Sequence, residues 1–125
     1  MCIAELQHRL LLDLRHLGLP IDEVDLFLRP YSKTYYGRYF PSTVETERAK
    51  IYVYPFNNDN ETIMNYDKIL ETLIHELCHH IQYSSGCVRL KGVMHNSHFW
   101  KLYNHYTDKA RQFNMLGGEE CEKAI

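Results

Sequence analysis

Residues 71–82 read Glu-Thr-Leu-Ile-His-Glu-Leu-Cys-His-His-Ile-Gln and contain an H-E-x-x-H motif at positions 75–79. Residues four apart lie on one face of a helix, so His75 and His79 point in nearly the same direction. At about 100° per residue, Glu76 lies about 60° beyond His79 on the same side. Two imidazoles in this arrangement can bind one metal ion while the carboxylate reaches a water molecule on it. The motif therefore predicts the metal site of a zinc peptidase.

The composition is typical of a globular protein and excludes several other classes. One domain is expected for 125 residues, of which 45% are hydrophobic and 24% are charged. The net charge of −2 provides no long-range attraction to nucleic acid or to an anionic membrane. No apolar run approaches the roughly 20 residues of a membrane span, and the N-terminus lacks the pattern of a secretory signal. We therefore expect a cytoplasmic protein without a membrane partner.

The cysteines give no sign of a disulfide framework. Four are scattered along the chain with no C-x-x-C pair: Cys2, Cys78, Cys87 and Cys121. Free thiols in a reducing compartment are the favoured interpretation, and a disulfide framework or a second metal site is the alternative.

The first half of the chain predicts one helix and a small sheet. Apolar residues recur three or four positions apart over residues 2–17, which is typical of an amphipathic helix, and Gly18 and Pro20 end it. Three short runs with turn signals between them predict a mostly antiparallel sheet of three strands. The runs span residues 24–28, 35–40 and 49–54. The tyrosines of this region fit either a half-buried sheet or aromatic pockets along a substrate-binding edge.

The second half predicts two more helices. The helix that carries the motif begins between residues 61 and 67, and Ser84-Ser85-Gly86 closes it. The last helix begins with Asn96 or Ser97 as its N-cap and ends at Gly117-Gly118. Its expected buried stripe comprises Phe99, Tyr103, Tyr106, Ala110 and Phe113. We thus expect a compact α+β domain over residues 1–118, with a short extended segment at 87–90 and a short acidic tail at 119–125.

A catalytic zinc ion usually has three protein ligands and one open position, so a third ligand is required. A metzincin would have Gly at position 82 and His at 85, where this chain has Gln82 and Ser85. Asp108 is a weak alternative, because it is the only acidic residue in the last helix. His95 is favoured, since it lies directly before the helix cap and its side chain can point back at the motif helix.

The surroundings of His95 bear on the same choice. Phe99 and Trp100 are expected to anchor the start of the last helix in the core and so to fix the position of His95. His98, three residues after His95 on the same turn, is the competing third ligand, or a group beside the ligands, or merely a solvated side chain. His80 and Gln82 share the motif helix but are left out of the predicted site. The remaining alternative is that these are unconnected surface histidines.

The motif at 75–79, followed by His95-x-x-x-Phe99-Trp100, resembles the SprT-like zinc metallopeptidases. That family typically shows H-E-x-x-H and then H-G-x-x-F, and a related bacterial group shows H-S-x-x-F-W. The expected order of elements is also similar, and the resemblance covers roughly residues 1–116. It implies a zincin-like fold and a peptidase that binds Zn²⁺ through His75, His79 and His95.

The chain departs from the family pattern in two respects. Asn96 stands where the family usually has Gly, and Asn tolerates a left-handed backbone better than most residues. The C-terminal zinc ribbon or basic DNA-binding extension of many members has no counterpart in this sequence. The DNA-linked roles of the family are therefore not carried over, and DNA is retained only as a weakly supported partner through basic residues of the last helix.

We expect hydrolysis of a protein or peptide, with Glu76 as the general base on a zinc-activated water. A substrate strand could add to the edge of the small sheet. Two alternatives remain open. One is a zinc-stabilised protein- or DNA-binding module without turnover, and the other is a metal hydrolase acting on a non-peptide bond.

Overall fold

The computed structural model describes residues 1–42, 44, 46–85 and 95–116. Three helices and a three-stranded sheet form an α+β fold, as the sequence predicts. The elements in chain order are α1 (Ile3–His16), the short 3₁₀ helix η1 (Ile21–Glu23), β1 (Val24–Leu28), β2 (Gly37–Phe40), β3 (Ala49–Val53), α2 (Tyr66–Ser85) and α3 (Ser97–Gln112). Within these ranges, no helix is both long and apolar enough to cross a membrane.

The sheet is mixed, with the order β1-β3-β2. β2 pairs with β3 in the antiparallel direction that the sequence predicts, with Tyr39 opposite Ile51. β1 pairs with β3 in parallel, with Leu26 opposite Ile51. The chain reverses once after β1 and again after β2, so β3 runs in the same direction as β1, and it lies between the other two strands. β2 is consequently an edge strand.

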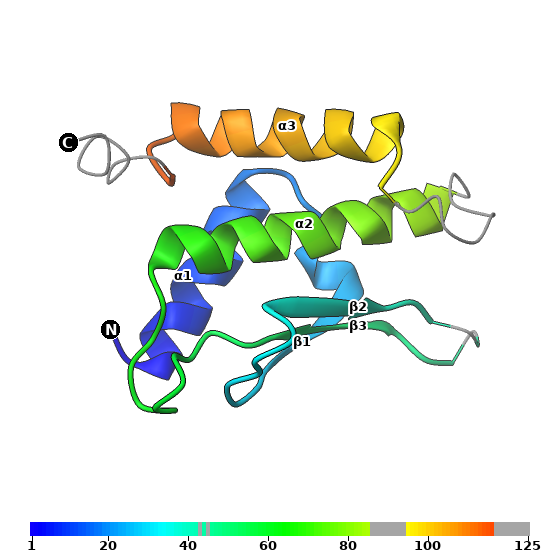
Figure 1. The fold of residues 1–125 in the computed structure, drawn as a ribbon. Helices are drawn as coiled ribbons and strands as arrows, with labels where there is room; N and C mark the ends of the chain where they lie inside the picture. Colours follow the sequence, from blue (N-terminus) through cyan, green and yellow to red (C-terminus); the bar gives the residue numbers. More distant parts are fainter. Residues whose placement is uncertain (43, 45, 86–94, 117–125) are drawn as a thin grey trace.

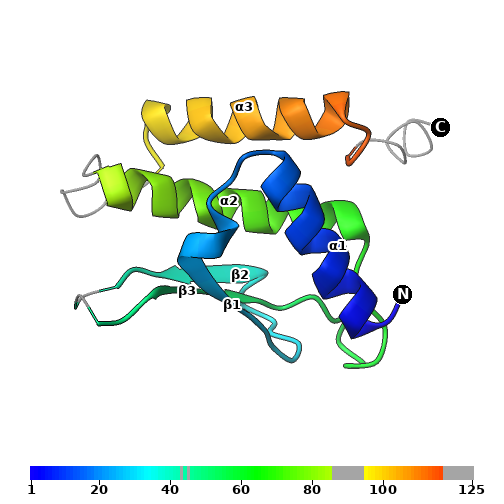
Figure 2. The same ribbon diagram turned by 180° about the vertical axis from the view of Figure 1, so that it is seen from behind.

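Helix α2 lies between the sheet and α3 (Figure 1). Viewed from behind, α1 crosses α2 on the side away from the first view (Figure 2). Apolar side chains from all three helices and the sheet meet in one core, and the fully buried ones on α2 are Ile69, Leu70, Leu73, Ile74, Leu77 and Cys78. The sequence predicts a buried stripe on this helix at Ile69, Leu70, Leu73, Ile74, Leu77 and Ile81, and all of it is buried except Ile81, which is partly exposed.

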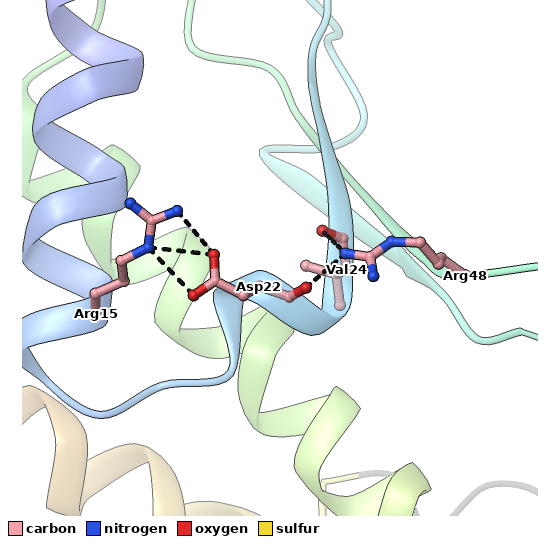
Figure 3. A network of polar contacts seen from close by, with 4 residues as sticks. All are labelled: Arg15, Asp22, Val24 and Arg48. Carbon is pink, nitrogen blue, oxygen red and sulfur yellow. Dashed lines mark hydrogen bonds and ion pairs between the residues drawn. The ribbon is translucent and has the colours of Figure 1, made fainter.

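Polar contacts join the end of α1 to the start of the sheet. The guanidinium of Arg15 on α1 donates to the carboxylate of Asp22 in η1, with the shortest bond at 2.8 Å (Figure 3). Arg48, just before β3, donates to the carbonyls of Asp22 and Val24 at 2.6 and 3.2 Å. The Arg15–Asp22 ion pair is solvent-exposed, so it contributes little to the stability of the fold. Together these polar contacts set how the chain enters β1 beside β3.

Two predictions about α3 need correction. The helix ends at Gln112, and Phe113 is 42% exposed and lies beyond the apolar stripe instead of within it. Trp100 is 44% exposed, so it does not anchor α3 in the core, whereas Phe99 is fully buried as predicted. The expected extended segment at 87–90, the glycine pair at 117–118 and the acidic tail lie outside the described residues.

The start of β2 is pressed against α2 at Gly37. A Cβ atom placed on Gly37 would lie 2.6 Å from Cγ2 of Thr72 and 3.3 Å from Cγ of Glu76. Thr72 cannot turn away freely, because its hydroxyl donates to the carbonyl of Lys68 at 2.8 Å. The close approach brings the sheet edge beside the motif helix.

We predict that Gly37→Ala lowers the free energy of unfolding by about 1–3 kcal/mol, since the added methyl group overpacks this contact. Urea unfolding followed by circular dichroism would measure the loss. Thr72→Ser removes the Cγ2 atom and keeps the hydroxyl, so Gly37→Ala in that background should recover at least half of the loss. Equal losses in both backgrounds would contradict the steric explanation.

Candidate metal centre

Three histidine side chains meet beside the second half of α2. Their metal-ligating nitrogens lie within 4.8 Å of one another, so His75, His79 and His95 can hold a metal ion. The Nε2 atom of His79 lies 3.3 Å from that of His75, and Nε2 of His95 lies 3.2 and 3.1 Å from those of His75 and His79. The three atoms form a nearly equilateral triangle. The predicted ligand set is thus brought together in space.

Hydrogen bonds among the three imidazoles cannot pair all of these nitrogens at once. A ring nitrogen of a neutral imidazole is either a donor or an acceptor. Among three mutually close nitrogens, at least one pair must therefore join two donors or two acceptors. A cation at the centre removes the conflict, because all three nitrogens can then present a lone pair to it. The arrangement is suited to a metal ion rather than to a hydrogen-bonded cluster.

Burial keeps two of the ligands unprotonated. Burial, with a smaller contribution from the charge of His95, lowers the pKa of His75 to about 4. Burial and the charges of His75 and His95 lower the pKa of His79 to about 4. Both imidazoles are therefore neutral at pH 7, which is the state that binds a metal ion.

Aromatic rings surround the three histidines. The fully buried ring of Phe99 has its centroid 4.9 Å from His75, 4.6 Å from His79 and 4.9 Å from His95. The ring of Trp100 stacks on His95 at 5.9 Å. Phe99 thus supports all three ligands from the core side, and Trp100 covers His95 from the solvent side. Trp100 therefore packs against a residue of the site instead of anchoring α3 in the core.

Glu76 and His75 line a cavity of about 280 Å³. The cavity lies between the start of β2 and α2, and Tyr35, Tyr36 and Tyr103 contribute to its walls. Burial raises the pKa of Glu76 to about 7. A carboxyl group with this pKa can both accept and release a proton near neutral pH.

Other residues considered from the sequence lie outside the triangle. Asp108 is paired with Arg111 at 3.1 Å, and Nδ1 of His98 contacts Gln82 at 3.1 Å. Cys78 is fully buried, and burial is the main cause that raises the pKa of its thiol to about 12, so it is an inert core residue. Cys2 and Cys78 are free thiols, and the other two cysteines lie outside the described part of the chain.

Sequence reasoning missed the two polar residues His80 and Gln82. Both are buried, at 7% and 0% exposure. His80 contacts the hydroxyl of Tyr39 on β2 at 2.8 Å and the carboxylate of Glu23 at 2.9 Å, so it joins α2 to two parts of the sheet region. Helical spacing would have revealed Gln82, because residues seven apart share a face and Gln82 follows His75 by seven.

The backbone at Asn96 also differs from expectation. Its φ of −84° and ψ of −177° are extended, so the left-handed conformation considered for this position is not used. Instead, the Asn96 side chain caps α3 by accepting the backbone N–H of Phe99 at 3.0 Å. The residue after His95 is thus the N-cap of α3, as the sequence predicts, and the helix itself begins at Ser97.

Comparison with known proteins assigns no family to the chain. No family model, no curated protein and no solved structure matches it. Its function must therefore be inferred from the chemistry of the site.

We predict that Zn²⁺ at 100 times its dissociation constant stabilises the protein by about 2.7 kcal/mol, which raises the unfolding midpoint by about 10 °C. His95→Ala should abolish both the shift and the zinc that remains after dialysis. His98→Ala is the matched control, and it should retain one zinc ion per chain. Retention of zinc by His95→Ala together with its loss from His98→Ala would reverse the choice of third ligand.

Proposed function

We propose that this protein is a zinc-dependent metallopeptidase of the SprT-like type. One observation carries the proposal: three histidine nitrogens form a triangle, and one of these residues, His75, lines an open cavity together with the buried Glu76. The resemblance of His95-x-x-x-Phe99-Trp100 to the family motif and the order of the helices and strands support the same assignment.

The triangle has the dimensions of a tetrahedral zinc site. Ligand nitrogens about 2.0–2.1 Å from a tetrahedral Zn²⁺ ion lie about 3.3 Å from one another. The three Nε2 separations are 3.1, 3.2 and 3.3 Å. Neutral imidazoles are also favoured ligands of this ion. The donor set and its spacing therefore fit zinc.

The number of ligands favours a catalytic over a structural site. Structural zinc usually has four protein ligands, whereas catalytic zinc has three and an open position. In the described ranges, no cysteine or acidic residue joins His75, His79 and His95. A structural site would also have no use for the buried carboxylate of Glu76. These two points argue against a zinc-stabilised binding module.

Zn²⁺ bound by these histidines would lower the pKa of a water molecule towards about 7 and polarise the scissile carbonyl group. Glu76 would take the proton from the attacking water, because its pKa of about 7 makes it a base near neutral pH. The same carboxyl group would then donate that proton to the nitrogen of the leaving amine. Phe99 and Trp100 would hold the histidines in place during the reaction.

The edge strand β2 is the proposed binding site for the substrate backbone. β2 pairs with β3 on one side, and its first residue, Gly37, lines the cavity together with Glu76. An extended peptide could pair with an edge strand through backbone hydrogen bonds that require little particular sequence. The adjacent Tyr35 and Tyr36 are 41% and 54% exposed and would contact its side chains. A protein or peptide is thus the proposed substrate.

Glu76→Gln is expected to reduce kcat for an unfolded protein substrate by about 10²–10⁴-fold, because the amide cannot accept the proton from water. Bound zinc, measured after dialysis, should remain at one ion per chain. Glu47→Gln makes the same chemical change on an exposed loop and should leave kcat unchanged. Full activity of Glu76→Gln would exclude the proposed mechanism.

Tyr103 is our choice for the donor that stabilises the oxyanion. It lines the cavity, and its ring centroid lies 5.9 Å from that of His75. Burial, with the charge of Glu71, raises the pKa of its phenol, so the hydroxyl stays protonated and can donate a hydrogen bond.

Tyr103→Phe should therefore lower kcat by about 10²-fold and leave zinc affinity unchanged, because only the hydroxyl is removed. Tyr106→Phe, one turn along α3 and outside the cavity, is the matched control and should keep wild-type kcat. Steady-state kinetics on the same substrate would compare them. Equal kcat values for the two variants would remove Tyr103 from the mechanism.

A further inference from the structure

Gln82 is a buried polar residue on the same face of α2 as the metal ligands. It follows His79 by three residues and His75 by seven, which places all three side chains within a sector of about 60°. Its side chain is fully buried. A buried amide must form hydrogen bonds to offset its loss of hydration, and its partners therefore identify what it holds in place.

The partners of Gln82 lie at the start of α3. Nε2 of Gln82 donates to Oδ1 of Asn96 at 3.0 Å and lies 3.1 Å from Nδ1 of His98. The Asn96 atom must be oxygen, because it also accepts the backbone N–H of Phe99 at 3.0 Å. The Gln82 atom that faces it must then be the amide nitrogen. Because that NH₂ group only donates, Nδ1 of His98 is its acceptor.

These contacts act directly beside the third ligand. Asn96 follows His95 in the chain. His98 is the residue that the sequence offers as the alternative third ligand. The hydrogen bond that the Asn96 side chain accepts from the Phe99 N–H is local to the start of α3. It does not set the position of α3 relative to α2. The bond from Gln82 crosses from α2, the helix that carries the other two ligands, to Asn96. It therefore links the third ligand to the first two.

We propose that Gln82 is a positioning residue that fixes His95 as the third metal ligand and holds Nδ1 of His98 away from the metal. The inference rests on the metal centre of the proposed function and deepens it. Outer groups of this kind usually change metal affinity by about 10–100-fold when they are removed.

The test compares metal binding by the full chain and by Gln82→Met, which has a similar length and no N–H group. The dissociation constant for Zn²⁺ would be measured by competition with a chromophoric chelator. We expect it to rise about 10–100-fold. The visible absorption spectrum of bound Co²⁺ should also change, because it reports the arrangement of the ligands. Trp100, the only tryptophan, stacks on His95 and provides a fluorescence signal at the site.

A buried hydroxyl on α3 supplies the matched control. Thr107 is 2% exposed, and its hydroxyl donates to the carbonyls of Tyr103 and Asn104 in its own helix. Thr107→Val should lower the unfolding midpoint of the protein from which a chelator has removed the metal. It should not change the zinc dissociation constant or the Co²⁺ spectrum. A general loss of stability is thereby separated from a change at the ligands.

Two variants of the partner residue test the same link if Gln82→Met does not fold. Asn96→Asp keeps an oxygen that accepts from both Gln82 and Phe99, so it should retain zinc affinity within about threefold. Asn96→Ala should weaken it at least as much as Gln82→Met does, because it removes the bond from Gln82 and also the cap bond from Phe99. Combined with Gln82→Met, it should weaken zinc binding by less than the two separate losses together, because the bond between Gln82 and Asn96 is lost only once.

The outcomes separate this inference from the proposed function. Wild-type zinc affinity and an unchanged Co²⁺ spectrum in Gln82→Met, or in Asn96→Ala, would overturn the positioning role and leave the proposed function intact. Failure of the wild-type chain to bind Zn²⁺ would overturn both.

Discussion

The burial of one face of α2 is the constraint on which the rest of the structure depends. Six apolar side chains of this helix are fully buried in the core: Ile69, Leu70, Leu73, Ile74, Leu77 and Cys78. With that face fixed, the rotation of α2 about its axis is fixed as well. His75 and His79 then lie on the flank where α3 begins, close enough to meet His95. The position of the three-histidine cluster is thus a consequence of hydrophobic packing.

The polar residues of α2 divide their contacts between its two neighbours. His79 and His80 are adjacent in the chain and differ by about 100° around the helix. His79 turns towards His95 near α3, whereas His80 bonds to Tyr39 on β2 and to Glu23 before β1. The helix is therefore tied to the sheet on one side and to the start of α3 on the other. His79 and His80 are both buried, so the loss of a polar partner is costly for either side chain.

The local parts of this architecture could be predicted from the sequence, and the contacts between elements could not. His75, Glu76 and His79 were found because four-residue spacing determines their relative direction on any helix. His95 was found because it precedes a helix cap. The parallel pairing of β1 with β3 depends on which strand occupies the centre of the sheet, which short strand patterns do not specify. The burial of Gln82 likewise depends on where α3 docks.

The geometry of the histidines implies that the cluster is already formed in the folded protein and that it lowers the stability of the fold. Burial and mutual proximity disfavour the protonated forms of His75 and His79, and three close nitrogens cannot all be paired by hydrogen bonds. The core nevertheless holds them together through Phe99, which contacts all three rings. Because this cost is met during folding, little reorganisation would be needed for a metal ion to bind. A loss of folding stability of this kind is expected where residues are kept for the function of a site and not for the stability of the fold.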